Sequence, residues 1–103
     1  WSAALDLKGT DFPYINSLKS HVGHCLSAAG SIECISTIVQ LSQGFIFRNI
    51  NCEDLNEEIA VTIDPSKIPV ETINAELRVV AKASFGFGDV NACVILKNFI
   101  ESR

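Results

Sequence analysis

The strongest periodic pattern of apolar residues runs from about residue 26 to residue 43. Its apolar positions recur at three- and four-residue spacing, which is typical of an α-helix. They are Ala28, Ala29, Ile32, Ile35, Ile38, Val39 and Leu41. Gly44 follows as a stop signal. Because the segment holds few charges, we expect a core helix that is covered on most sides.

Two runs rich in β-branched residues close the chain and predict strands over 76–84 and 90–97. They flank the sequence FGFGD, whose two glycines suit a tight connection. A plain hairpin turn with a buried pair of phenylalanines is one interpretation of this segment, and a functional loop is the other.

The remaining segments predict short elements. Residues 1–12 hold the end of a helix that stops at Gly9. In chain order there follow an extended stretch over 14–18, a loop over 19–25, a second extended stretch over 45–52, a solvated acidic loop over 53–58, a short strand over 61–63 and a turn-rich connection over 64–69. One long helix packed on strands predicts an α/β or α+β layer.

Composition narrows the class of protein. The chain has 103 residues, enough for one domain or part of one, and its 48% of apolar residues indicate a globular fold. It contains no Met and begins at Trp1, so we expect a piece of a longer polypeptide. A net charge of −4 with scattered basic residues disfavours a nucleic-acid partner. Neither a membrane-length apolar run nor a signal peptide is visible, so no membrane partner is expected.

The cysteines fit neither paired metal-ligand spacing nor a dense disulfide framework. They are Cys25, Cys34, Cys52 and Cys93. Each lies among apolar or small neighbours, where a free cysteine behaves as a small hydrophobic residue. We therefore expect reduced, buried thiols and a cytoplasmic location.

Candidate chemistry gathers in the loop KSHVGHC before the long helix. A loop that enters a helix presents free N–H groups to an anion or a developing oxyanion. His24 lies there, and a Lys19 and a Glu33 near it would fix its tautomer and keep it a neutral donor. A purely structural hydrogen-bonding histidine is the alternative. A zinc site of His21, His24 and Cys25 lacks an evident fourth ligand, so we expect no metal and no cofactor.

Three stretches resemble β-ketoacyl-acyl-carrier-protein synthases, the condensing enzymes of fatty acid and polyketide synthesis. NSLKSHVGHCLSAAGSIE resembles their Lys–x4–His motif and the helix after it, and QGFIFRNINCEDLNEE is similar to the following segment of the elongating enzymes. ASFGFGDVNACVILK resembles their closing turn and final strand. The stretches occur in the family's order and cover about residues 14–98.

The resemblance implies a thiolase-like fold, built from two similar α/β halves. It places residues 1–103 in the C-terminal part of the second half, as an incomplete half-domain with the core helix packed on a mixed sheet. The implied partners are the missing N-terminal part of the synthase, acyl carrier protein bearing acyl or malonyl groups, and a second copy in a homodimer.

The resemblance also implies roles in the KSHVGHC loop and in the helix after it. Lys19 and His24 match the active-site lysine and the second catalytic histidine, and Glu33 matches the buried acid that pairs with this network. In the family the histidine donates from Nε2 to the malonyl thioester carbonyl and stabilises the enolate formed as carbon dioxide leaves. Glu33 would offset the desolvation cost of Lys19.

The closing turn receives implied roles as well. Phe85 matches the aromatic residue that gates acyl entry, and its backbone N–H matches an oxyanion-hole donor. Gly86, Phe87 and Gly88 complete this gate segment, and the glycines supply its mobility. Asp89 departs from the family, which usually has Gly at this position, and leaves ordinary activity in question.

The implied function is the decarboxylative Claisen condensation of acyl and malonyl thioesters, an acyltransferase reaction. The family's acylated cysteine and its first histidine have no counterpart in these residues, so we expect the fragment alone to be inactive. A non-catalytic partner subunit that shapes the acyl tunnel is the alternative, and a stand-alone interaction module is a third. Lys19 and His24 favour the enzyme, whereas Asp89 leaves room for the partner subunit.

Overall fold

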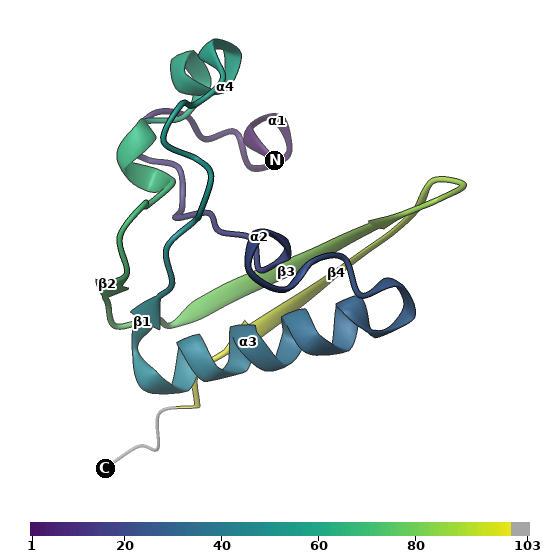
Figure 1. Ribbon diagram of the computed structural model, residues 1–103. Coiled ribbons are helices and arrows are strands. Elements are labelled where there is room, and N and C mark those ends of the chain that lie inside the picture. The colour runs from purple at the N-terminus through teal and green to yellow at the C-terminus, as the bar shows by residue number, and fades with distance from the viewer. Residues whose placement is uncertain (100–103) are drawn as a thin grey trace. The chain divides into compact units, whose positions relative to one another are not determined.

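The computed structural model describes residues 1–99, which form two compact units (Figure 1). Unit 1 consists of Trp1–Gly23 and Phe47–Ile73, and unit 2 consists of His24–Ile46 and the chain from Asn74 onward. The predicted domain range 1–103 also includes residues 100–103, which lie outside the described residues. Among the described residues, no helix is long and apolar enough to cross a membrane.

Unit 1 contains short helices joined by irregular segments. They are α1 (Ser2–Leu5), α2 (Lys19–Val22), α4 (Glu57–Thr62) and the 3₁₀ turn η2 (Pro65–Lys67). Asn56 caps α4, since its side-chain oxygen accepts the N–H of Glu58 at 2.8 Å. Asp64 caps η2 in the same way, through the N–H of Ser66 at 2.9 Å.

Several expectations for unit 1 are wrong. The predicted strand over 61–63 is largely helix α4, because the Asn56 cap and two acidic residues in the first turn start a helix that overrides β-branched propensity. Only Ile63 pairs as a strand does, in an isolated parallel bridge to Gly9. The predicted loop over 19–25 contains α2, and the helix predicted to stop at Gly9 ends already at Leu5.

The interior of unit 1 is organised around Phe12 and Asn49, which are 2% and 5% exposed. The Asn49 amide nitrogen donates to the carbonyls of Ile15 and Pro69 at 2.9 and 3.1 Å. Its side-chain oxygen accepts the N–H of Ser17 at 3.1 Å. Hydrogen bonds from the Ile15 N–H to the Lys67 carbonyl and from the Asn16 amide to the Phe47 carbonyl also hold the predicted extended stretch over 14–18, and no assigned strand of the described chain covers it.

Unit 2 carries the long helix and the closing strands. Its elements are the 3₁₀ turn η1 (Leu26–Ala28), α3 (Ala29–Gln43), β1 (Phe45–Ile46), β3 (Val79–Gly86) and β4 (Val90–Lys97), and β2 (Ile73–Asn74) falls at the boundary of the units. The predicted helix over 26–43 is confirmed, with a 3₁₀ first turn. Gly44 ends it in the left-handed conformation, φ 74°, as a C-terminal glycine does.

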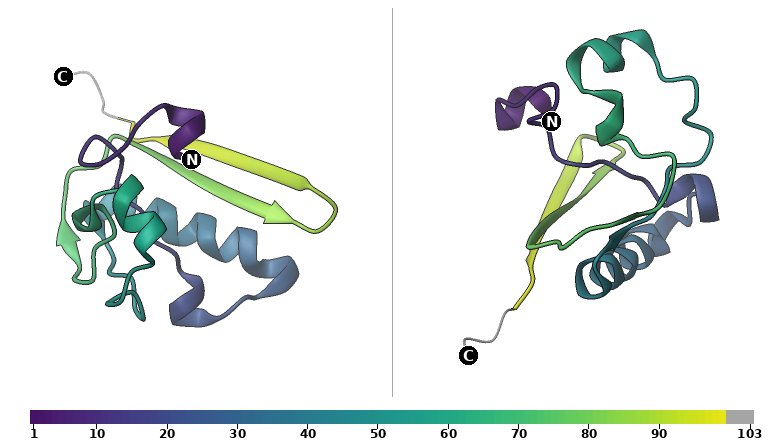
Figure 2. Two further views of the ribbon diagram at one scale, coloured as in Figure 1. Left: turned by 90° about the horizontal axis from the view of Figure 1, so that it is seen from above. Right: turned by 90° about the vertical axis from the view of Figure 1, so that its left-hand side faces the viewer.

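The last two strands form an antiparallel hairpin in which Val79 pairs with Lys97 and Gly86 with Val90. Helix α3 lies along this hairpin and runs antiparallel to β3 (Figure 2). Two contacts fix that direction: Glu33 near the start of α3 reaches Lys82 in the middle of β3, and Leu41 near the end of α3 contacts Asn98, just past β4.

Two packing expectations for unit 2 are wrong. The sheet under α3 is a two-stranded antiparallel hairpin, and not the predicted mixed sheet. The helix is also not covered on most sides, since Ile35 and Ile38 are 62% and 51% exposed. A two-stranded hairpin is one layer, so within the described chain it covers one side of α3 and leaves the opposite apolar face open.

Candidate active site

His24 is the first residue of unit 2 and lies two residues before η1. The backbone N–H of Leu26 donates to His24 Nδ1 at 3.0 Å. Because this partner is a donor, Nδ1 must be the unprotonated nitrogen, and the neutral ring then carries its hydrogen on Nε2. The side chain is exposed, so His24 presents an Nε2–H donor outward from the start of the helix.

The turn that supplies this hydrogen bond is conformationally costly. Leu26 has φ 51°, a left-handed conformation that non-glycine residues rarely adopt and that costs about 1–2 kcal/mol. Its side chain is 75% exposed, so packing within the described chain does not offset that cost. Strain of this kind is typical of functional loops.

Lys19, the predicted partner of His24, begins α2 in unit 1. Its backbone N–H donates to Ser17 Oγ at 3.3 Å, and its side chain is exposed. Lys19 and His24 belong to different units, so a role for Lys19 beside the imidazole stays a prediction.

Glu33 lies in the second turn of α3 and forms an ion pair with Lys82, whose Nζ is 3.1 Å from Glu33 Oε1. The two side chains are 15% and 8% exposed. Lys82 Nζ also donates to the hydroxyl of Ser84. Lys82 is not among the site residues predicted from the sequence, although strand alternation places it on the same face of β3 as Val80 and Ser84.

The SFGFG turn is a hairpin turn with exposed aromatic side chains. Phe85 and Phe87 are 72% and 101% exposed, so the interpretation of a buried phenylalanine pair is wrong. Gly88 and Asp89 adopt φ 76° and 59°. A side chain at Gly86 would meet the Val90 carbonyl at 3.2 Å, which explains the glycine there.

The conformation of Asp89 also explains the departure from the family pattern. Glycine adopts a left-handed φ freely, and aspartate is among the few residues that tolerate it at modest cost. The Asp89 side chain is exposed. The turn therefore keeps the shape that a glycine would give, with one added surface charge.

The start of the helix and the SFGFG turn lie at the same end of unit 2 (Figure 2). The Glu33–Lys82 contact fixes the register of α3 against β3. From Glu33 back to Ala29 the helix rises about 6 Å, and from Lys82 forward to Phe85 the strand advances about 10 Å in the same direction. The helix start that follows His24 and the end of β3, which holds Phe85 and leads into the turn, are thus arranged at one edge.

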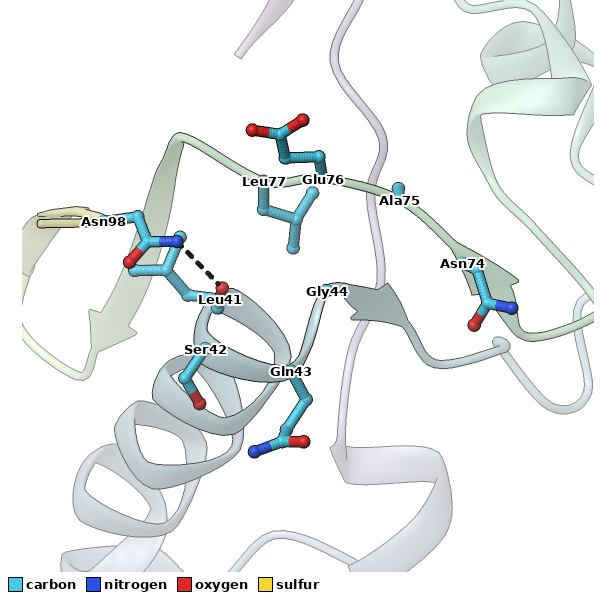
Figure 3. A pocket seen from close by; sticks show the side chains of 9 residues that line it. All are labelled: Leu41, Ser42, Gln43, Gly44, Asn74, Ala75, Glu76, Leu77 and Asn98. Atoms are coloured by element: carbon cyan, nitrogen blue, oxygen red, sulfur yellow. Dashed lines mark hydrogen bonds between the residues drawn. The ribbon is translucent and has the colours of Figure 1, made fainter. Parts of the chain in front are cut away.

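A pocket in unit 2 lies at the other end of α3. It has a volume of about 480 Å³ and is bounded by the end of the helix and residues 74–77. Figure 3 shows Asn98 at its rim, where the side-chain nitrogen donates to the Leu41 carbonyl at 3.5 Å. A second pocket, of about 290 Å³, lies in unit 1. No predicted site residue lines either pocket.

His21 has its own structural partners in unit 1. Its Nε2 donates to the Arg48 carbonyl at 2.8 Å, and its ring packs edge-to-face on Phe47 with centroids 5.4 Å apart. Within residues 1–99, no group of three or more His, Cys, Asp or Glu side chains is arranged to hold a metal ion.

All four cysteines are free thiols, as the sequence predicts. Their predicted burial is wrong in part. Cys93 is exposed on β4 because the hairpin has no layer over its outer side in the described chain, and the other three are half-buried.

Comparison with known proteins agrees with the motifs. Residues 2–53 match the family model described as β-ketoacyl synthase, C-terminal domain. The chain is 38% identical over 96 residues to 3-oxoacyl-acyl-carrier-protein synthase 1 of Escherichia coli strain K12, which covers 93% of this chain and 23% of the relative. It is 42% identical over 92 residues to the synthase 1 of Haemophilus influenzae, with coverage of 88% and 22%.

A plant relative is similar to the same extent. The chloroplastic 3-oxoacyl-acyl-carrier-protein synthase I of Arabidopsis thaliana is 39% identical over 92 residues, which are 89% of this chain and 19% of the relative. The chain thus spans about a fifth of the length of these relatives. On the family match and these identities together, the chain belongs to the β-ketoacyl synthase family and corresponds to its C-terminal domain.

Proposed function

We propose that this chain is the C-terminal part of a 3-oxoacyl-acyl-carrier-protein synthase, which condenses acyl and malonyl thioesters with loss of carbon dioxide. The names of the relatives support this reaction class. The observation that carries the proposal is the hydrogen bond from the Leu26 N–H to His24 Nδ1 at 3.0 Å. It leaves Nε2–H as the donor, which is the atom that the condensation requires of this histidine.

His24 acts on the malonyl thioester. As the bond to the carboxylate breaks, its electron pair moves toward the thioester carbonyl and negative charge develops on that oxygen. The Nε2–H of the neutral ring donates to the oxygen, and no proton needs to leave or reach Nδ1. One preorganised donor of this kind is typically worth about 3–4 kcal/mol of the barrier.

Lys19 and Glu33 complete the electrostatics of this site. The family motif supports a role for the Lys19 ammonium in favouring the developing negative charge. Burial of Glu33, which is 15% exposed, weakens its screening by water, so its carboxylate interacts strongly with the Lys82 ammonium. A neutral imidazole that carries its hydrogen on Nε2 is a fixed dipole, aimed at charge that appears only in the transition state.

The SFGFG turn supplies the second part of the site. The backbone N–H of Phe85 donates to the oxyanion, and the aromatic side chains of Phe85 and Phe87 gate the entry of the acyl chain. Gly86 and Gly88 permit the turn to move. Exposure of both phenylalanines in the described chain leaves them free to contact an acyl chain or the remainder of the synthase.

The partners follow from the reaction. The acyl and malonyl groups arrive on acyl carrier protein, the nucleophilic cysteine and the first histidine come from the N-terminal part of the synthase, and the complete enzyme forms a homodimer. Free thiols suit the reducing cytoplasm. Without the nucleophile, this chain alone neither condenses nor decarboxylates its substrates.

A non-catalytic partner subunit is the second candidate, and Asp89 favours it. Its carboxylate lies next to the gate, at a position where the family usually has Gly. The two candidates differ upstream, because the enzyme requires a cysteine nucleophile and the partner subunit does not.

The test replaces His24 in the complete synthase and follows release of carbon dioxide from malonyl-carrier protein. We expect His24→Ala to lower decarboxylation about 10²–10³-fold while acylation of the nucleophilic cysteine persists. His24→Gln, whose amide nitrogen reaches the position of Nε2, should retain more activity than His24→Asn, whose amide nitrogen lies near Nδ1.

His21→Ala is the matched control, because this exposed histidine bonds within unit 1 and has no role in the reaction. We expect it to decarboxylate within about threefold of the unsubstituted enzyme, a change below 1 kcal/mol. Equal losses in the two alanine variants, or unchanged decarboxylation in His24→Ala, would remove His24 from the mechanism.

A further inference from the structure

We propose that Lys82 is a positioning residue of this site. Its ammonium group joins Glu33 on α3 to Ser84 on β3 and so fixes the SFGFG turn against the helix that starts beside His24. This inference rests on the proposed function, because it concerns the relative placement of the two hydrogen-bond donors that act on one oxyanion.

The contacts of Lys82 are specific. Its side chain is 8% exposed on the inner face of β3, and its Nζ lies 3.1 Å from Glu33 Oε1. The same nitrogen donates to Ser84 Oγ. An ammonium group carries three donors on a flexible stem. Lys82 can therefore bond to Glu33 on α3 and to Ser84 on β3 at the same time.

The position of this junction is what gives it a role. Ser84 immediately precedes Phe85, the residue whose backbone N–H is proposed to face the oxyanion. Glu33 lies about one turn after the start of α3, which His24 precedes. Lys82 therefore joins the segments that carry the two donors.

Lys82 is also the last buried anchor before the turn. Every residue from 85 to 95 is exposed in the described structure, whereas Lys82 is buried and Ser84 is half-buried. The hairpin thus extends past this point without packing inside its own unit. Donors in an active site must be held to about 0.5 Å, and a displacement of about 1 Å can lower a rate about 10²-fold.

The first test is Lys82→Met in the complete synthase, which keeps the length of the side chain and removes its charge. We expect kcat for malonyl decarboxylation to fall about tenfold while KM changes less than about twofold, because substrate docking is left intact and donor placement is not. Lys97→Met is the matched control. Lys97 is exposed on the same hairpin, and this variant should keep the unsubstituted kcat.

The second test asks whether Lys82 acts through Ser84. We expect Ser84→Ala to lower kcat about threefold, and the double variant Lys82→Met/Ser84→Ala to be no slower than Lys82→Met alone, as for residues that act as one unit. If Lys82 and Ser84 only stabilised the fold, the kcat losses of the two single variants would multiply in the double variant, or no variant would lose kcat below its melting temperature. Either result overturns the proposal. Ser84→Ala removes only a hydroxyl, so it gives the answer even if Lys82→Met does not fold.

The two proposals fail in different ways. If His24→Ala abolishes decarboxylation while Lys82→Met and Ser84→Ala keep the unsubstituted kcat, the function stands and the role of Lys82 falls. If the unsubstituted protein does not decarboxylate, the proposed function falls. Hydrogen exchange of the 79–91 peptide then decides on Lys82: faster exchange in Lys82→Met and Ser84→Ala than in Lys97→Met supports the anchor, and equal exchange overturns it.

Discussion

A buried polar side chain makes long-range contacts in each unit, and the chemistry of these contacts differs. In unit 1 the neutral amide of Asn49 hydrogen-bonds the backbone of Ile15, Ser17 and Pro69. In unit 2 the Lys82 ammonium pairs with the Glu33 carboxylate across α3 and β3 and donates to the Ser84 hydroxyl. One network connects a side chain to backbone groups, and the other connects three side chains.

This difference distinguishes a residue that stabilises the fold, Asn49, from a pair that fixes the position of one element on another, Lys82 and Glu33. Backbone groups cannot be removed by mutation, so loss of the Asn49 amide takes a hydrogen-bond partner from the part-buried Ile15 carbonyl and Ser17 N–H. An ion pair can be removed as a whole, and an apolar pair in its place is often equally stable. Unit 1 therefore depends on its polar residue for stability, whereas unit 2 has another reason to keep its charged pair, which accords with a positioning role for Lys82.

The largest expected effect is that of Asn49→Leu. It leaves the Ile15 carbonyl and the Ser17 N–H without the amide bonds that they make now. At about 1–3 kcal/mol for each unpaired buried group, we expect a loss of about 3 kcal/mol in the free energy of unfolding. The urea midpoint measures it. Asn91→Leu, at an exposed asparagine, is the control and should change stability by less than about 0.5 kcal/mol. A loss below about 1 kcal/mol in Asn49→Leu would contradict this account of unit 1.

The next effect is that of Glu33→Gln, which leaves the Lys82 ammonium buried without its carboxylate. Breaking such a pair costs about 3–5 kcal/mol when both charges are fully buried, and the 15% exposure of Glu33 lowers our expectation to about 2 kcal/mol. Urea unfolding should show that the double variant Glu33→Gln/Lys82→Met recovers most of this loss. Losses that simply add in the double variant would show that the pair is not a removable unit, and the contrast with Asn49 would disappear.

The same contrast explains how much of the fold the sequence predicts. The helix over 26–43 and the two closing strands follow from periodicity, because each pattern lies within one continuous segment. Unit 1 has no such pattern. Its order comes from Asn49 bonding to segments around residues 15 and 69, far away in the chain, and no local rule identifies an asparagine in FRNIN as the residue that joins them.

The candidate site is predictable to a similar degree. His24 and the SFGFG turn follow from motifs, since their spacing is local. The donor at His24 Nδ1 was not expected from the sequence, which suggested Lys19 and Glu33 as the residues that fix the ring. The Leu26 N–H meets the ring in a turn in which Leu26 itself adopts a left-handed conformation that its side chain disfavours. The pairing of Lys82 with Glu33 depends on the register of α3 on β3, so the sequence alone does not predict it.

The smallest effect concerns Asp64, an exposed cap in unit 1 that sharpens the comparison with the buried Asn49. Hydrogen bonds from the Ser66 hydroxyl and from the Ser66 N–H, with a smaller contribution from Lys67, lower the pKa of Asp64 below its ordinary value of 3.8. A carboxyl whose pKa is lower in the folded state stabilises the fold above its ordinary pKa, and this stabilisation is lost as pH falls through the folded value.

The unsubstituted protein should therefore be slightly more stable than Asp64→Asn at neutral pH, and their urea midpoints should converge in acid. Water screens this exposed group, so the difference should be far smaller than that for Asn49→Leu. Asn49→Leu, which changes no titrating group, should keep its deficit over the same pH range. The stability losses of Asn49→Leu and Asp64→Asn could instead change with pH in the same way. Both residues would then stabilise unit 1 through charge, and burial would not explain the difference between them.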